Sequence, residues 1–501
     1  MTNSLPLLPL VLWQVPEGLR RALAQTGVPC CEHSAGPTAG RFVLFDSRVA
    51  MRPCIGDGQT AIDVDALRRG HDTDPFAALE DEQSFRGQWR IGPLRVREVV
   101  ARVAKRIVRR QLMRDLRTKI ESAGGTWLQI GAYPHPYRSV FNFRIDHDDY
   151  VEHDFAATLD AIEGHEAAIS HYVCASGFVG RREVLSRLKG QHVGSHGFWH
   201  HTFRDAAENL RNVRRGVEAL RNEGIEPVGF AAPHGRFNRG LLAALTQLRV
   251  SHGSEFGLAY DDLPFFMGNV LQIPIHPICL GICLEAAGER SAGIEGAEPG
   301  GGNRCATGFL TARPVVNPAA AAETALAHFQ TVACEAHRGG EPILFYGHPT
   351  GRLGRFPHVL SGILDVARQL DGVWRTTLAE WEAWWRARAD VILSVVRDDA
   401  RWIVRAIGRP KSYTATVEIW RGETVASLPL ASDTTTFTPA ALAFERWGPG
   451  CELPTPLPVP RSGWREGLRD YLDWERVTPI DDLQGRTWRH WAKRTLRRIR
   501  A

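Results

Sequence analysis

Two short stretches place acidic and imidazole side chains at spacings that suit metal chemistry. Asp146 and Asp148 end the apolar run Phe141-Asn-Phe-Arg-Ile-Asp146-His-Asp148. Residues two apart on an extended strand point the same way, so both carboxylates can face one point. His196 and His200 are four apart, and a helical turn or a tight loop can aim both imidazoles at one ion. One carboxylate and two imidazoles predict a divalent-metal site with positions open for water and substrate.

Such a site favours metal-assisted hydrolysis of an amide or an ester. The metal lowers the pKa of a bound water and polarises a carbonyl, and a free carboxylate beside it can take the water's proton. A leaving amine also needs a general acid, for which His348 is the first candidate and His276 the competing one. His201 offers a second ligand register and Asp149 another carboxylate. The residues alone leave these alternatives open.

A repeated strand and helix pattern positions these residues. The predicted strands cover residues 139–145, 168–174, 192–195, 228–231, 250–254, 270–275 and 343–346. The predicted helices cover residues 152–163, 181–188, 206–223, 238–248 and 318–338. Repeated units of this kind imply a parallel sheet, and a run of this length predicts a barrel or a barrel that lacks one strand. Chemistry in such folds gathers at the carboxyl ends of the strands, where the candidate residues fall.

The order of these motifs resembles the polysaccharide deacetylase family, also called carbohydrate esterase family four or NodB-like, in its subgroup with one residue between the aspartates. The matching motifs are Asp146-His-Asp148, His196-Gly-Phe-Trp-His200, Pro233-His-Gly235 and His348-Pro349. The resemblance covers roughly residues 138 to 385, about half of the chain. It implies a distorted (β/α) barrel with one divalent metal, usually zinc, that removes N- or O-acyl groups from sugars. Some relatives act on small cyclic amides instead.

Carried over position by position, the resemblance implies a role for each motif residue. Asp146 corresponds to the catalytic base and His348 to the general acid. The implied metal triad is Asp148, His196 and His200. The predicted substrate contacts are Pro233, Gly235, Trp199 and Tyr346. The family's usual Arg-x-Pro-x-Gly motif stands here as Ala231-Ala-Pro233-His-Gly235, so the arginine that orients the base is replaced by alanine. The candidates to take its place are Arg144, Arg236 and His234.

Two further units flank the predicted barrel at residues 136–385. Residues 1–135 predict an N-terminal α/β domain of undetermined role, with strands at 11–13 and 41–46 and a helix at 17–26. Residues 386–485 alternate at period two and predict a small antiparallel β module. The predicted fold class is therefore α/β: a distorted (β/α) barrel deacetylase-like domain, an N-terminal α/β domain and a small C-terminal β module.

Two basic segments stand out from a net charge of only +5. Residues 94–120 predict one long amphipathic helix, whose arginine-rich face suits nucleic acid, anionic lipid, an acidic glycan or plain solvent. Residues 486–501 predict a basic tail helix with Trp488 and Trp491, typical of peripheral membrane contact, although packing on the protein or on another subunit fits equally. Nothing resembles a base-reading module, so nucleic acid is disfavoured. A glycine-rich insert at 285–308 predicts a surface loop.

The remaining composition concerns the compartment and the class of protein. The 501 residues, 44% of them hydrophobic, suffice for more than one core. The nine cysteines form no paired Cys-x-x-Cys sets, which favours free thiols in a reducing compartment. The N-terminus lacks the basic start of a signal peptide, and no run approaches the roughly 20 apolar residues of a membrane span. We therefore expect a cytoplasmic protein, with membrane-peripheral contact through the tail helix.

The sequence thus predicts a metal-dependent carbohydrate deacetylase. The alternatives are a hydrolase of a small non-sugar amide and a catalytically inactive barrel that binds a glycan. The sugar, the acyl group and the oligomeric state stay open.

Overall fold

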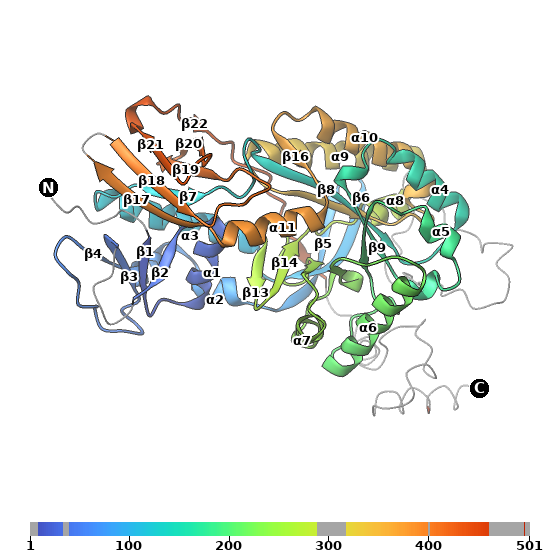
Figure 1. Cartoon of the computed structure of the whole chain (residues 1–501). Coiled ribbons are helices and arrows are strands. Elements are labelled where there is room, and N and C mark those ends of the chain that lie inside the picture. The colour runs from blue at the N-terminus through green and yellow to red at the C-terminus, as the bar shows by residue number, and fades with distance from the viewer. Residues whose placement is uncertain (1–8, 34–39, 288–316, 399–400, 460–494, 496–501) are drawn as a thin grey trace.

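The computed structural model describes residues 9–33, 40–287, 317–398, 401–459 and 495 (Figure 1). Its largest element is a nine-stranded sheet of order β13-β14-β12-β11-β10-β9-β8-β15, with β16 also paired to β8. These strands are β8 (Ser139–His147), β9 (Ile169–Val173), β10 (His192–Ser195), β11 (Phe230–Ala231), β12 (His252–Glu255), β13 (Phe265–Met267), β14 (Val270–Pro274), β15 (Ile343–Gly347) and β16 (Val373–Arg375). All neighbours are parallel except β13 and β14. The predicted α/β pattern with a parallel sheet is confirmed.

The two ends of this sheet path approach each other. The backbone N–H of His276, just after β14, donates to the carbonyl oxygen of Leu344 in β15 at 2.8 Å. The carboxyl ends of the parallel strands therefore surround a common region.

Several of the helices that connect these strands begin at polar caps. The connecting helices are α4 (Glu152–Ala161), α5 (Arg182–Ser186), α6 (Ala206–Asn222), α7 (Arg239–Gln247), α8 (Leu280–Ala287), α9 (Pro318–Arg338), α10 (Pro357–Gln369) and α11 (Leu378–Ala389). The Asp205 carboxylate accepts hydrogen bonds from the first turn of α6, and the Asn238 side chain does so for α7. Thr377 and Glu380 form a capping box at α11. These caps satisfy backbone donors that a helix start leaves unpaired, and they fix where each strand-to-helix loop ends.

The first strand of the sheet, β8, is buried along its whole length. Phe141, Phe143 and Ile145 belong to the main hydrophobic core. Alternate residues are polar, and the Asn142 side-chain amide donates to the Ala168 carbonyl at 3.1 Å, to Ser170 Oγ at 2.9 Å and to the Thr376 carbonyl at 2.9 Å. The period of two in a strand separates these two sets of side chains onto opposite faces.

The N-terminal part contains the predicted parallel strands and helix. A four-stranded sheet of order β2-β1-β3-β4 consists of β1 (Leu10–Trp13), β2 (Cys30–Glu32), β3 (Phe42–Phe45) and β4 (Thr60–Asp63). Helix α1 (Glu17–Thr26) and helix α2 (Pro75–Glu80) accompany it. One hydrophobic core runs without interruption from Leu10, through β8, to Cys451. The N-terminal sheet therefore packs as part of the same body as the central sheet.

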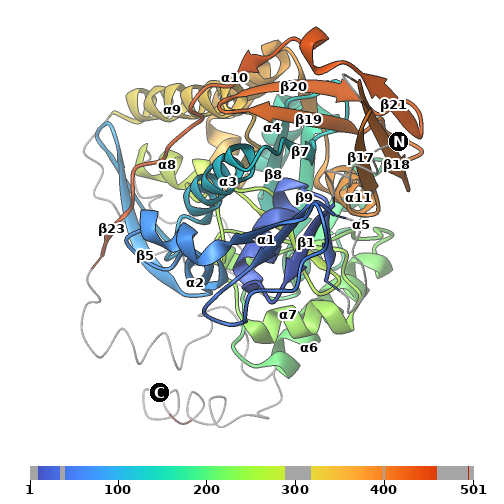
Figure 2. The ribbon, with the colours of Figure 1, turned by 90° about the vertical axis from the view of Figure 1, so that its left-hand side faces the viewer.

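The single helix predicted over residues 94–120 is wrong. Residues Ser84–Ile91 (β5) and Leu94–Ala101 (β6) form an antiparallel hairpin, and helix α3 begins only at Lys105 and ends at Ser122 (Figure 2). Leu94, Val96 and Val100 are buried while their neighbours Arg95 and Arg97 are exposed. This alternation is typical of a strand, and it prevailed over the helical spacing of the same valines.

The arginine-rich face of α3 does not lie in solvent. Arg106 and Arg109 are buried, whereas Ile107 is 43% exposed. Arg109 Nη2 lies 2.6 Å from Asp262 Oδ1, and Arg106 Nη1 lies 2.9 Å from Glu341 Oε2. Arg110 also pairs with Glu341. The expectation of a solvated or ligand-binding face is therefore wrong for these three arginines, because carboxylates of this chain neutralise them.

The C-terminal strands are antiparallel, as predicted. One sheet has the order β17-β18-β21, from β17 (Ile392–Asp398), β18 (Arg401–Ile407) and β21 (Thr434–Phe437). The other has the order β22-β20-β19-β7, from β19 (Thr416–Arg421), β20 (Thr424–Pro429), β22 (Glu445–Arg446) and β7 (Trp127–Ile130), which comes from the far side of the sequence. Strand β23 (Leu457–Pro458) pairs with β5.

Two predicted segments lie outside the described residues: the insert from residue 288 to 308, and the tail helix at 486–501 except Thr495. Within the ranges that the structure describes, no helix is both long enough and apolar enough to cross a membrane.

The ion pair between α3 and the loop after β12 yields a stability prediction. Asp262→Asn leaves the buried Arg109 guanidinium without its counter-charge, and breaking a buried pair from one side costs roughly 3–5 kcal/mol. We expect the urea midpoint of unfolding to fall accordingly. Asp365→Asn breaks the exposed pair with Arg368 and serves as the control, with an expected cost of less than about 1 kcal/mol. Equal effects of the two variants would contradict the buried pairing.

Candidate metal centre

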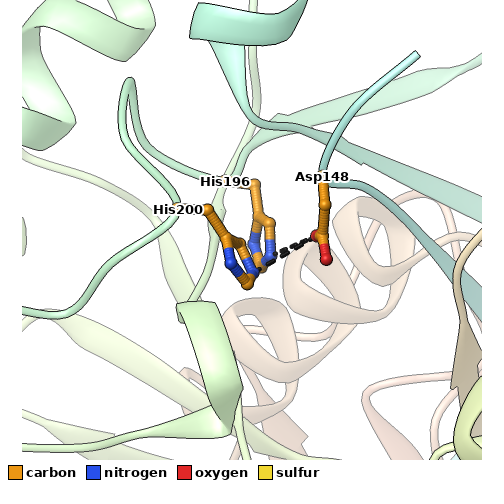
Figure 3. A group of neighbouring side chains, drawn as sticks. All are labelled: Asp148, His196 and His200. Carbon is orange, nitrogen blue, oxygen red and sulfur yellow. Dashed lines mark ion pairs between the residues drawn. The ribbon is translucent and has the colours of Figure 1, made fainter. Parts of the chain in front are cut away.

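Three predicted ligands meet at the carboxyl ends of β8 and β10 (Figure 3). Asp148 follows β8, His196 follows β10, and His200 lies in the loop between β10 and α6. Asp148 Oδ1 lies 3.3 Å from His196 Nε2 and 3.2 Å from His200 Nε2. One ligand atom from each of the three residues lies within 4.8 Å of the other two. Residues that are up to 52 positions apart in the sequence thus converge on one point, as predicted.

Asn212 of α6 holds the histidine loop in place. Its side-chain oxygen accepts the backbone N–H groups of Phe198 at 3.1 Å and Trp199 at 2.8 Å. Its amide donates to the carbonyls of Trp199 at 3.1 Å and His201 at 3.0 Å. Helix α6 therefore fixes the short loop whose turn brings His200 back beside His196.

The donor set fits a divalent cation. His196 Nδ1 contacts the Ala231 carbonyl at 2.9 Å, so the neutral ring, which is the form that binds a metal, would present Nε2 as an acceptor. This acceptor faces Asp148 Oδ1, and both atoms are buried without a hydrogen-bond partner. Ligand atoms held tetrahedrally at about 2.1 Å from an ion lie roughly 3.4 Å apart, which agrees with the spacings here. A positive ion between these acceptors satisfies both of them.

The electrostatics of Asp148 keep it ionised. Burial alone would raise its pKa, but the His200, His348 and His196 imidazoles outweigh burial and hold the pKa of Asp148 well below its usual value. An ionised carboxylate is the form that binds a metal.

Asp146 has a different partner from Asp148. Its Oδ2 accepts from Arg144 Nη2 at 2.6 Å, and both side chains are almost wholly buried. Arg144 Nη1 donates to the Ser254 carbonyl at 3.0 Å and to Ser254 Oγ at 2.9 Å. The guanidinium carbon lies 5.0 Å from the ring centroid of Tyr346. Asp146 Oδ1 is buried, and no described residue forms a hydrogen bond with it.

Arg144 therefore supplies the positive charge that the altered Ala231 position cannot. Of the three candidates for this place, Arg144 contacts Asp146 directly. Burial lowers the pKa of His234 to about 3, so that ring is neutral and brings no charge. Arg144 lies in the same strand as Asp146, two residues earlier in the sequence.

His348 and His276 have different surroundings. His348 Nε2 lies 3.5 Å from Asp148 Oδ2, and its Nδ1 lies 3.4 Å from Cys279 Sγ. His276 Nδ1 instead contacts Asp261 Oδ1 at 2.9 Å. Its ring packs against Phe345, with the ring centroids 5.4 Å apart. His348 thus borders the candidate metal centre, while His276 is paired with an acid of its own.

The alternative ligands lie apart from the triad. In the described part of the chain, the one acid and histidine group with metal-ligand geometry is the triad itself. His201 packs its ring against Phe203, with the centroids 4.7 Å apart. Burial raises the pKa of Asp149, whose side chain lies near Thr350. The geometry therefore favours the triad over a register that uses His201 or Asp149.

The Pro233-to-Gly235 turn lies beside the triad. The His234 ring lies 4.6 Å from the His200 ring, centroid to centroid. Gly235 has a φ of 58°, and a Cβ there would lie 2.2 Å from the Phe256 ring. Only glycine therefore fits at this position. Thr202 Oγ1 donates to the Pro233 carbonyl at 3.2 Å and ties the turn to the histidine loop.

The aromatic residues predicted to contact substrate are both buried. Trp199 is 1% exposed and packs in a hydrophobic cluster with Phe203. This placement argues against a substrate contact, because the indole faces the core instead of the metal centre. Tyr346 is 4% exposed, and its hydroxyl donates to Glu98 of β6 at 3.4 Å. Tyr346 thus lies beneath Arg144 as part of the support of Asp146.

Sequence reasoning missed three residues that touch the site: Ser254, Cys279 and Asn212. Ser254 and Cys279 lie 110 and 69 residues from the residues that they contact, Asn212 lies 11 to 14 residues from the loop that it holds, and none stands in a motif. Ser254 lies at the carboxyl end of a predicted strand, and this position was the only signal in the sequence that could have indicated its contact with the site.

The sequence matches no protein-family model and no curated protein. Among solved structures, it is similar to a Mycobacterium smegmatis protein described as a polysaccharide deacetylase, with 16% identity, a TM-score of 0.40 and coverage of 51% of this chain and 93% of the other. PuuE allantoinase shares 12% identity with a TM-score of 0.38 over 52% of this chain and 93% of its own. A family 4 carbohydrate esterase from Streptomyces lividans shares 10% identity with a TM-score of 0.29 over 48% and 92%. Polysaccharide deacetylases and family 4 carbohydrate esterases are thus among the proteins that resemble about half of this chain.

The geometry of the triad yields a metal-binding prediction. Zinc titrated into metal-free protein should bind at about one ion per chain, since three ligands and open positions suit one catalytic-type site. Loss of a residue that only supports a metal ligand weakens metal binding about 10–100-fold. Asp148→Asn removes a ligand itself, so we expect it to weaken zinc binding by more than that. Asp146→Asn is the matched control and should keep the ion, because Asp146 pairs with Arg144. Calorimetric titration measures all three, and equal loss in both variants would contradict the division of roles.

Proposed function

We propose that this protein is a metal-dependent hydrolase that removes an acyl group, N-acetyl in the first instance, from a sugar or a polysaccharide precursor. One observation carries this proposal: two aspartates at one strand end have opposite environments. Asp148 faces two imidazoles, while Asp146 is paired with Arg144 and keeps one oxygen atom without a hydrogen-bond partner. Two acids with separate environments suit separate roles as metal ligand and general base.

The proposal includes the shape of the central sheet and the identity of the ion. We describe the sheet as a distorted (β/α) barrel, supported by its parallel order and by the hydrogen bond from His276 to Leu344 between its ends. Two imidazoles and one carboxylate form the ligand set that zinc favours in catalytic sites. Such an ion would supply Lewis-acid polarisation of the acyl carbonyl.

Asp146 is placed to accept the proton of the attacking water. Arg144 fixes the carboxylate from one side and leaves Oδ1 as the free acceptor. Arg144 is itself fixed by Ser254 and by the ring of Tyr346, so the base cannot rotate freely. A general base held in this way contributes about 10²–10⁴-fold to the rate.

His348 is placed to donate a proton to the leaving amine. Burial raises the pKa of the Cys279 thiol well above its usual value, so the thiol keeps its proton beside His348 Nδ1. Burial lowers the pKa of His348 well below its usual value, so its ring is neutral before the reaction. With Nδ1 facing a thiol donor, Nε2 on the side of Asp148 is the acceptor, which can take up the proton released by the attacking water and pass it on to the leaving amine.

Acetate release from N-acetylated sugar oligomers tests the function. The metal-replete parent should release acetate, chelation should abolish release, and Asp146→Asn should lower kcat by about 10²–10⁴-fold with the ion retained. Asp160→Asn, an exposed acid on α4, is the control and should act as the parent does. If the protein opens cyclic imides or ureides and does not hydrolyse acetylated sugars, its substrate is a small amide and not a sugar. Sugar binding without turnover would leave a binding protein.

The support of the base yields a separate prediction. Arg144→Gln removes the charge that orients Asp146 but no ligand of the ion, so kcat should fall by about 10–100-fold at an unchanged metal content. Ser254→Ala removes one of the two contacts that Ser254 makes with Arg144 and should cause a smaller fall. Steady-state kinetics with metal analysis measures both effects. Full activity of the Arg144→Gln variant would show that Asp146 needs no cationic partner.

A further inference from the structure

The outer face of the β5–β6 hairpin carries a group of arginines. Arg90 stands directly opposite Arg95, and Gln88 stands opposite Arg97. Because side chains alternate along a strand, these residues share one face. Arg90, Arg95 and Arg97 are exposed, and we call these three the hairpin arginines. Leu94, Val96 and Val100 occupy the opposite, buried face.

No carboxylate among the described residues forms an ion pair with the hairpin arginines. Arg97 Nε donates to Gln88 Oε1 at 2.8 Å, and Arg90 Nε donates to the Gly92 carbonyl at 3.0 Å. Like charges directly opposite each other on paired strands destabilise the pair, so Arg90 opposite Arg95 lowers the stability of the hairpin. The contrast with α3 is direct, since Arg106 and Arg109 there have carboxylate partners. An external anion would relieve this repulsion.

The same hairpin touches the support of the candidate metal centre. The backbone N–H of Ala101 donates to the Phe256 carbonyl at 3.0 Å, just after β12. The Phe256 ring lies 5.5 Å from the Tyr346 ring, centroid to centroid, and Tyr346 is bonded to Glu98, the neighbour of Arg97. The hairpin therefore stands beside the strand ends that carry the metal centre.

We propose that the hairpin arginines bind a polysaccharide that bears carboxylate groups, which the hairpin guides to the metal centre. Arg95 and Arg97 are two residues apart on one strand, so their positions repeat at roughly 7 Å, a spacing that suits repeated negative groups along a polymer. The outer face has no aromatic side chain for stacking on bases, and its apolar residues are only Val99 and the buried Ala101, so it lacks the features of nucleic-acid and membrane surfaces. Binding of the polymer does not depend on the proposed function. Only the statement that the bound polymer is the substrate rests on it.

Binding of polygalacturonate, a polymer of uronic acid, tests the proposal with the full-length protein. The parent should bind it in calorimetry or in a gel-shift assay, and binding should weaken between about 50 and about 500 mM salt because the screening length shortens. The variant with Arg90→Gln, Arg95→Gln and Arg97→Gln should bind about tenfold or more weakly. The control variant, Arg214→Gln with Arg375→Gln and Arg405→Gln, removes the same charge from exposed sites elsewhere and should bind as the parent does.

Catalysis separates this inference from the proposed function. The hairpin variant should release acetate from small neutral N-acetylated oligomers at the parent's rate, because it leaves the metal centre intact. If no substrate is deacetylated by the parent but the hairpin variant still loses polymer binding, the binding surface stands and the proposed function fails. Equal weakening in the control variant, or equal binding of a neutral polymer, overturns the binding surface. Tighter binding of DNA or of anionic vesicles than of polygalacturonate also overturns it.

Discussion

The site depends on how a wholly buried strand satisfies its polar side chains. Strand β8 presents Asn142, Arg144 and Asp146 on one face, and each must find partners because an unpaired buried polar group costs about 1–3 kcal/mol, and a charge more. The partners come from separate segments: Asn142 bonds Ser170 of β9 and the carbonyl of Thr376 after β16, while Arg144 bonds Ser254 of β12. These contacts fix β9, the segment after β16 and the more distant strand β12 in relation to β8. The same contacts therefore determine both the register of the sheet and the position of the acids at its end.

The need to pair buried polar groups also gives Asp146 and Asp148 different partners. Asp146 and Asp148 differ by two positions, yet one meets a guanidinium and the other meets imidazoles. Arg144 donates to Asp146 from within β8 itself, so the pair needs no residue from a distant motif. The charge beside Asp146 therefore comes from β8 itself, whereas position 231 holds an alanine.

The sequence predicted the strands from the period of their hydrophobic residues, and it predicted the convergence of the triad from the order of its motifs at successive strand ends. Strand β10 and helix α9 lie at their predicted bounds, and Asp148, His196 and His200 share one point. The hairpin at 84–101 was missed because Val96 and Val99 fit a helical step as well as an alternating one, and the buried face decides between them only after folding. The pairing of β7 with β19 joins segments almost 300 residues apart, and Cys279 contacts His348 across 69 residues of sequence. No local pattern carries such contacts.

The basic stretch from Arg95 to Lys119 shows that the charge of a segment does not indicate which of its residues can bind a partner. Its arginines have two fates. Arg106 and Arg109 on α3 are buried and need Glu341 and Asp262 to offset desolvation, whereas Arg95 and Arg97 on β6 are exposed to water, where an unpaired charge costs little. Burial thus removes the first group from any external partner. The second group remains able to bind an anion because, within the described ranges, it forms no ion pair with a carboxylate and lies in solvent. Whether a basic segment meets a partner is therefore decided by which of its charges the fold has already neutralised.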